Sequence, residues 1–139
     1  MPLEISTDVS RIDRTRLYAW FADAYWSKTR SVEIIEKSLA NSDCYSAFDG
    51  DEMVGFARVV TDGATFAWLC DVYVDASRRG EGVSKALMDV VLSNPEYATV
   101  RWMLATRDAH GLYEKYGFAT SVETDRWMTR GFNVRPPRD

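Results

Sequence analysis

The stretch VDASRRGEGVSKALMDVVL, residues 74–92, places two arginines and two glycines directly before an apolar run with helical spacing. A single Asp, Ser or Gly can begin a helix, so Gly80 and Gly82 exceed what an N-cap requires. The first turn of a helix leaves N–H groups unpaired and carries partial positive charge, which suits an anion. The alternative is that Gly80 only permits a turn and that Arg78 and Arg79 are solvated.

The spacing of these glycines excludes two common phosphate loops. A P-loop requires G-x-x-x-x-G-K-[ST] and a dinucleotide fold requires G-x-G-x-x-G. Here the sequence is Gly80-Glu81-Gly82, and Ser84 follows two positions later. Such a short loop could present the amides of residues 80–85 to a pyrophosphate, with the two arginines at its rim.

The composition is that of one globular domain. A chain of 139 residues with 46% hydrophobic and 27% charged residues is predicted to form a single domain over 1–139, with a frayed tail at 131–139. A net charge of −4 argues against a nucleic-acid partner and leaves room for a cationic or neutral substrate. No apolar run is long enough to span a membrane, and the first residues do not resemble a signal peptide, so we expect a cytoplasmic protein.

The residues that usually bind metals are scarce. Cys44 and Cys70 stand apart in two strand-like runs and are expected to be buried free thiols, although a disulfide or a reactive pair is the alternative. His110 is the only histidine, and a helix-surface position is the expected one for it; the alternative is that it relays a proton to the nearby Tyr113. We therefore expect no metal site.

Hydrophobic periodicity predicts an α+β fold. Apolar residues alternate in strand-like runs and recur at helical spacing between them. The expected strands are Leu3–Thr7, 44–48, 53–60, 64–74, 98–106 and 125–129; the expected helices are 11–26, 31–42, 83–92 and 107–117. An Asp-Gly turn should join two strands as a hairpin, and the strands around the 83–92 helix should pair in parallel.

Two motifs together resemble the GNAT superfamily of acetyl-CoA-dependent N-acetyltransferases. The family loop reads Q/R-x-x-G-x-G/A, and residues 79–84 match it with Ser84 in place of the last small residue. The family's following helix often reads LYEKxGF, which residues 112–118 match fully. An asparagine often precedes the tyrosine by seven positions, and here that position is Thr106.

The resemblance implies a mixed sheet of about six to seven strands, with an antiparallel N-terminal half, a central splayed parallel pair and about four flanking helices. It implies that acetyl-CoA lies where the parallel strands separate and that its pyrophosphate sits on the glycine loop. The coenzyme-binding residues implied in this way are Val72, Val74, Arg79, Gly80, Gly82, Val83, Ser84, Lys85 and Thr106.

The resemblance also implies the chemistry. Transfer from a thioester to an amine requires alignment of the partners, a neutral amine and a proton for the departing thiolate. Tyr113 matches the family's proton donor; the alternative is an ordinary aromatic on a short helix. Asp71 is the candidate base, on the argument that a carboxylate in a partly apolar strand has a raised pKa, and the alternative is a structural or exposed carboxylate.

The acceptor is expected to be a primary amine on a small molecule or peptide. Trp20 and Trp26 lie where the family carries its acceptor lid, and an acidic neighbour such as Asp23 would suit an amine by cation–π contact. Two other functions stay open: a non-catalytic acyl-CoA sensor on the same fold, and an interaction domain. A homodimer is possible if the last strand pairs across a two-fold axis.

Overall fold

The computed structural model describes residues 2–121 and 124–131, which form two compact units that meet in sequence between Ala105 and Thr106. Because each unit is described by itself, a single domain over 1–139 stays a prediction. The first unit contains β1 (Glu4–Ser6), α1 (Arg14–Asp23), α2 (Val32–Ala40), β2 (Asp43–Asp49), β3 (Glu52–Thr61), β4 (Phe66–Val74), α3 (Val83–Leu92) and β5 (Arg101–Met103). The second contains α4 (His110–Glu114).

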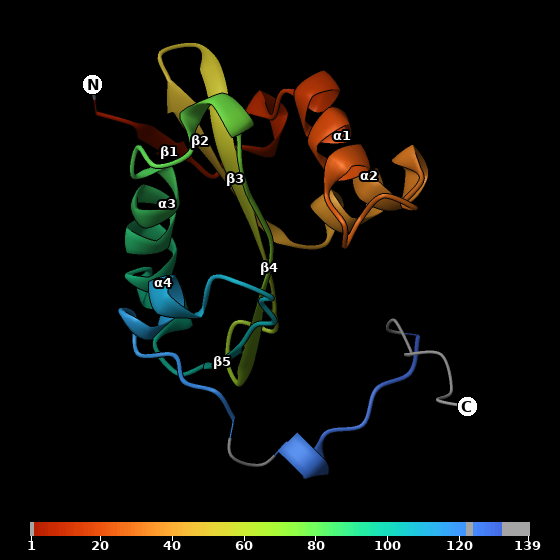
Figure 1. Ribbon diagram of the computed structural model, residues 1–139, viewed down its shortest axis with the longest axis vertical. Helices are drawn as coiled ribbons and strands as arrows, with labels where there is room; N and C mark the ends of the chain where they lie inside the picture. Colours follow the sequence, from red (N-terminus) through yellow and green to blue (C-terminus); the bar gives the residue numbers. More distant parts are fainter. Residues whose placement is uncertain (1, 122–123, 132–139) are drawn as a thin grey trace. The chain divides into compact units, whose positions relative to one another are not determined.

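The first unit is a five-stranded mixed sheet between helices. The strands lie in the order β1-β2-β3-β4-β5, with antiparallel pairs up to β4 and a parallel pair at the end. Helices α1 and α2 cover one face and α3 covers the other (Figure 1). The predicted α+β architecture and its parallel crossover are confirmed.

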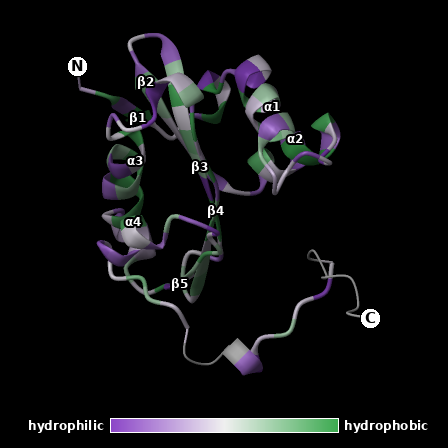
Figure 2. Ribbon diagram, viewed as in Figure 1, coloured by the Kyte–Doolittle hydropathy of each residue, from purple (hydrophilic) through white to green (hydrophobic). Residues whose placement is uncertain are grey.

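Each face of the sheet has its own apolar layer. On the α1 and α2 side, Leu17, Phe21 and Leu39 pack with Phe56 of β3. On the other side, α3 buries Leu87, whose side chain faces β3 at Gly55. The helices are hydrophobic on part of their surface and hydrophilic on the rest (Figure 2), as expected of helices that cover a sheet.

Local chemistry explains where these elements begin and turn. The Ser31 side chain accepts a hydrogen bond from the Ile34 amide at 3.2 Å, which confirms it as the N-cap of α2. Gly50 and Gly63 have φ of +61° and +75° in the β2–β3 and β3–β4 turns, where other residues are strained. The predicted hairpin and the second turn are both confirmed.

The parallel pair is much shorter than the sequence suggests. We expected a strand over 98–106, but β5 pairs with β4 only through Phe66–Arg101, Ala67–Trp102 and Trp68–Met103. The preceding residues form a short 3-10 helix, Pro95–Tyr97, and a turn in which the Val100 amide donates to the Tyr97 carbonyl. No other strand among the described residues pairs with β4 on that side after Trp68.

The six to seven strands expected are not confirmed, because the described residues form five. The strand expected at 125–129 is wrong: Thr124–Arg126 form a 3-10 helix and residues 127–129 have no regular structure. Trp127 and Met128 are 57% and 94% exposed, so this segment buries no apolar face of the kind that stabilises a strand. The frayed tail expected at 131–139 lies outside the described residues except for Gly131.

Gly55 sets how closely α3 approaches the sheet. A Cβ placed there would lie 2.6 Å from Val83 Cγ1 and 3.2 Å from Leu87 Cδ1. We expect Gly55→Ala to lower the free energy of unfolding by about 1–3 kcal/mol, because the branched Val83 side chain cannot turn away and α3 must move. Urea denaturation measures this change.

The matched control is Gly111→Ala in α4, where an added Cβ meets nothing within 4 Å. Alanine is the better helix former, so this variant should be neutral or slightly more stable. Equal stability of Gly55→Ala and wild type would contradict the close packing of α3.

Candidate active site

The glycine loop is a helix N-terminus without a side-chain cap. Gly82 is the N-cap of α3 with φ +84°, and Gly80 has φ +81°. The Ala86 amide makes the first helical bond, to the Gly82 carbonyl at 3.0 Å. A Cβ at either glycine would meet nothing within 4 Å, so the space over the loop is open. An uncapped helix N-terminus with open space before it can bind an anion.

The two loop arginines have different surroundings. Arg78 bonds Asp49 at 2.7 Å and Glu81 at 3.0 Å, so it fastens the loop to the end of β2. Arg79 is exposed, and its Nε donates to the Val74 carbonyl at 3.2 Å. Its guanidinium lies 5.3 Å above the Tyr73 ring. Arg79 is therefore the loop cation with freedom to meet an anion.

The open edge of β4 leads to this loop. Pairing with β5 ends at Trp68, whereas β4 continues through Val72 and Val74 and is followed by the 3-10 helix Ala76–Arg78. The side chains of Val72 and Val74 are half-buried. A strand with an unpaired side can bind an extended ligand by main-chain hydrogen bonds.

Asp71 interrupts β4 with a bulge. Among the described residues it is the only non-glycine residue with positive φ, +54°, and the β3–β4 register shifts opposite it between Phe56 and Arg58. The side chain is 1% exposed. Its Oδ2 accepts from Arg30 Nη1 and Arg58 Nε, each at 2.8 Å, and its Oδ1 accepts from Trp26 Nε1 at 3.1 Å.

The expected raised pKa of Asp71 is wrong. Burial alone raises it, but the hydrogen bond from Arg30 and the charges of Arg58 and Arg30 outweigh burial and lower the pKa below 3.8. A carboxylate whose pKa is lowered by folding stabilises the native state above its unfolded pKa. That contribution is lost as the pH falls through the lower, folded value.

Aromatic side chains gather beside this bulge. Trp20 is buried, stacks on Tyr73 at 5.2 Å and donates its indole N–H to Asp75. Trp26 is 38% exposed, with its ring 6.5 Å from that of Tyr73. The Tyr73 hydroxyl donates to Asp23 Oδ2 at 3.2 Å. Of the two tryptophans predicted to face the acceptor, Trp26 presents a surface and Trp20 supports Tyr73.

The second unit holds the other predicted residues. Tyr113 lies in α4, is 8% exposed, and packs edge-on against Phe118 at 6.0 Å. Burial raises its pKa, so the phenol is protonated at neutral pH. Thr106 Oγ1 accepts from the Ala109 amide at 3.0 Å, and His110 is exposed at the start of α4. Gly117, with φ +89°, ends the turn after α4 as predicted.

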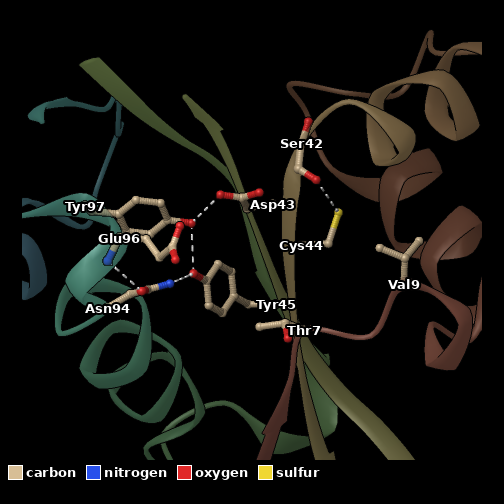
Figure 3. Close-up of a pocket in the computed structure, with 9 residues that line it drawn as sticks. All are labelled: Thr7, Val9, Ser42, Asp43, Cys44, Tyr45, Asn94, Glu96 and Tyr97. Carbon is tan, nitrogen blue, oxygen red and sulfur yellow. Dashed lines mark hydrogen bonds between the residues drawn. The ribbon is translucent and has the colours of Figure 1, made fainter. Parts of the chain in front are cut away.

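A hollow of about 350 Å³ lies elsewhere in the first unit (Figure 3). Hydrogen bonds run along its wall: Asn94 donates to the Tyr45 hydroxyl, the two tyrosine hydroxyls are 2.8 Å apart, and Tyr97 donates to Asp43. This chain ties the segment after α3 to β2. None of its buried side-chain nitrogen or oxygen atoms lacks a partner, so we assign it to structure.

Sequence reasoning missed the partners of Asp71. Arg58 and Asp71 each interrupt an apolar strand, and these strands are neighbours in the predicted meander. Two opposite charges in adjacent buried strands are a signal for an ion pair. Nothing local, by contrast, indicates that Trp26 and Arg30 reach the same carboxylate.

The two cysteines are free thiols. Burial raises the pKa of Cys44 to about 11 and that of Cys70 to about 12, and both are free. In residues 2–121 and 124–131 no group of three or more metal-ligating side chains was found. Of the helices in those same ranges, none is long and apolar enough to cross a membrane.

Comparison with known proteins gives concordant matches. A family model for the acetyltransferase (GNAT) domain matches residues 40–120. A crystal structure from Xanthomonas campestris, of a protein assigned to the GNAT family, is 39% identical over 94% of this chain and 93% of that one, with a TM-score of 0.90. No curated protein matched.

Two more distant structures share the fold. A GNAT family acetyltransferase from Streptococcus pneumoniae is 24% identical, over 97% of this chain and 98% of that one, with a TM-score of 0.71. One from Elizabethkingia anophelis, solved with acetyl-CoA bound, is 21% identical over 86% and 76% of the two chains, with a TM-score of 0.60.

Proposed function

The chain belongs to the GNAT family of acetyltransferases, and on that premise we propose that it transfers the acetyl group of acetyl-CoA directly to a primary amine of a small molecule or peptide. The N–C bond forms as the C–S bond breaks, the amine loses a proton, and the thiolate gains one. The observation that carries the proposal is the continuity of an open β4 edge with an uncapped glycine turn. A cytoplasmic location and a homodimer stay predictions.

The coenzyme is proposed to bind along β4 and the loop. The unpaired side of β4 supports main-chain bonds from Val72 and Val74 to the pantetheine arm. The glycine turn supports a pyrophosphate on the amides of Arg79, Gly80, Gly82, Val83, Ser84 and Lys85. Because Arg79 bonds the Val74 carbonyl, it stands at the junction of the two parts. A contribution from Thr106 stays a prediction, since its hydroxyl already accepts from the Ala109 amide.

Tyr113 is proposed as the general acid for the departing thiolate. The complete LYEKxGF motif supports this role. Burial raises the pKa of Tyr113, so the phenol carries a proton at neutral pH but is a weaker acid than a free tyrosine. Direct transfer requires no covalent intermediate. The protein's task is then to align the amine with the thioester and to manage two protons.

The acceptor amine is proposed to approach past Trp26, Tyr73 and Asp23. The exposed face of Trp26 offers cation–π contact, and the Asp23 carboxylate offers an opposite charge beside it. A base role for Asp71 stays a prediction that the geometry does not favour. Two arginines and an indole N–H occupy its oxygens, and its low pKa makes it a weak proton acceptor.

Calorimetric titration with acetyl-CoA tests the coenzyme site, and a thiol-release assay tests turnover of spermidine, kanamycin, L-lysine and a peptide with a free N-terminus. We expect micromolar binding and release of coenzyme A with at least one amine. Arg79→Glu should weaken binding about 10- to 100-fold, because it replaces a charged hydrogen-bond donor with a like charge beside the pyrophosphate.

The matched control is Lys37→Glu, the same charge reversal at an exposed position of α2. It should leave the acetyl-CoA affinity unchanged. Binding without turnover of any amine would favour the sensor function instead, and no binding by the wild type would contradict the proposal.

A further inference from the structure

Asp71 holds a conformation that its surroundings must maintain. The left-handed backbone region is unfavourable for residues other than glycine, and Asp71 adopts it inside a strand. Asp and Asn tolerate this region better than most residues. The three donors to its carboxylate, at 2.8, 2.8 and 3.1 Å, are the interactions that fix its side chain.

Two of these donors come from one segment, residues 24–31 between α1 and α2, which we name the 24–31 connection. Trp26 donates to Oδ1 and Arg30 to Oδ2. The other side-chain bonds shown for this segment reach only the neighbouring helices: Ser27 Oγ donates to the Phe21 carbonyl, and Ser31 Oγ accepts from the Ile34 amide. The carboxylate of Asp71 therefore fastens the connection to the sheet.

The charges make this fastening hard to replace. Arg58 is 7% exposed, and Arg30 is partly buried as its guanidinium lies 5.5 Å from the Phe21 ring. One carboxylate thus balances two guanidinium groups. If its charge is removed, the buried cations repel each other without compensation, and Arg30 is the one that can leave.

The position of Asp71 in β4 joins this network to the coenzyme edge. It lies after Trp68, where pairing with β5 ends, and directly before Val72. On the side of the sheet that α1 and α2 cover, its carboxylate accepts a hydrogen bond from Trp26, whose ring lies 6.5 Å from that of Tyr73. One residue therefore lies in the strand proposed for the coenzyme and, through its side chain, binds the segment proposed for the acceptor.

We infer that Asp71 is a positioning residue that fastens the 24–31 connection to the open edge of β4 and so orders the acceptor side of the site. The inference rests on the proposed function for what binds on each side. It makes the ion-pair network a determinant of amine binding. Asp71 itself takes no proton from the amine.

Asp71→Asn is the sharpest variant, because asparagine keeps the volume and tolerates the left-handed backbone. Asparagine offers only one uncharged oxygen to the three donors that bind the Asp71 carboxylate. We expect hydrogen exchange of the amides in the 24–31 connection to quicken by about tenfold or more in the free protein. Acetyl-CoA should slow exchange there in the wild type, and this protection should be lost in the variant although the coenzyme still binds.

Kinetics provide the second readout. With the amine that the wild type turns over best in the panel above, KM for the amine should rise about tenfold or more, while kcat stays within about threefold. Trp26→Phe removes the donor to Oδ1 and also shrinks the aromatic face proposed for the amine, so it should raise KM for the amine in the same direction. A merely structural role would lower stability and leave the KM for the amine unchanged.

Glu36→Gln is the matched control. Glu36 is also a carboxylate between helices, but the partners shown for it, the Tyr18 hydroxyl at 2.6 Å and Arg14 at 3.4 Å, belong to α1 and not to the 24–31 connection. It should leave exchange in that connection unchanged. If Asp71→Asn exchanges there like the wild type, the inference is overturned.

The outcomes separate this inference from the proposed function. Failure of the wild type to bind acetyl-CoA would contradict the function, whereas exchange in the free Asp71→Asn protein would still test the fastening. Normal binding and turnover with an unchanged connection would contradict the inference alone.

Discussion

Tyr113→Phe is expected to lower kcat by about 10²- to 10⁴-fold, the range that a positioned general acid contributes. Phenylalanine keeps the packing against Phe118 and removes only the hydroxyl. The dissociation constant for acetyl-CoA should therefore change by less than about threefold. Steady-state kinetics with the best amine of the panel measure the first effect, and calorimetry measures the second.

The pH profile adds a readout that a packing defect would not move. Burial raises the pKa of Tyr113, so wild-type kcat should decline only at alkaline pH, as the phenol ionises. The variant should lack this decline. Tyr116→Phe, the same change three positions later, is the control; a kcat for Tyr113→Phe close to that of the control would exclude the general-acid role.

Gly82→Trp is expected to weaken acetyl-CoA binding by more than about 100-fold. An added Cβ at Gly82 meets nothing within 4 Å, so the indole fits outside the fold, in the space proposed for the pyrophosphate. The left-handed backbone of this position adds a strain of about 1–2 kcal/mol. Calorimetry and thermal unfolding separate lost affinity from lost stability.

Gly63→Trp reproduces the strain without the obstruction. Gly63 has φ +75° and equally open surroundings, but it lies in the turn between β3 and β4. Similar stabilities of the two variants, with affinity lost only in Gly82→Trp, would locate the coenzyme on the loop. Equal affinities would place it elsewhere.

The order of elements in the first unit was predictable because local signals agree with each other. Ser31 caps α2, glycines form the turns, and apolar periodicity distinguishes strands from helices. The extent of β5 was not predictable, because alternation in 98–106 does not reveal how much of a strand finds a partner. The strand expected at 125–129 was wrong because five residues are too few for alternation of apolar and polar residues to identify a strand.

The candidate site was predictable where it is made of backbone. Glycines favour turns with positive φ, and both Gly80 and Gly82 have positive φ in the structure. The environment of Asp71 was not predictable, because its three donors lie 13 to 45 residues away. Its low pKa depends on those distant arginines, and the sequence around it indicates only burial.

Because β4 and β5 pair over only three residues, the protein in solution is expected to associate and to gain stability from a bound ligand. A strand side without a neighbour is a template on which other chains can add, which promotes association and precipitation. A ligand that fills this place removes the template and adds stability, by about 2.7 kcal/mol at a concentration 100 times its dissociation constant. The protein should therefore store and crystallise better with coenzyme A present, and its melting temperature should depend on how much is added.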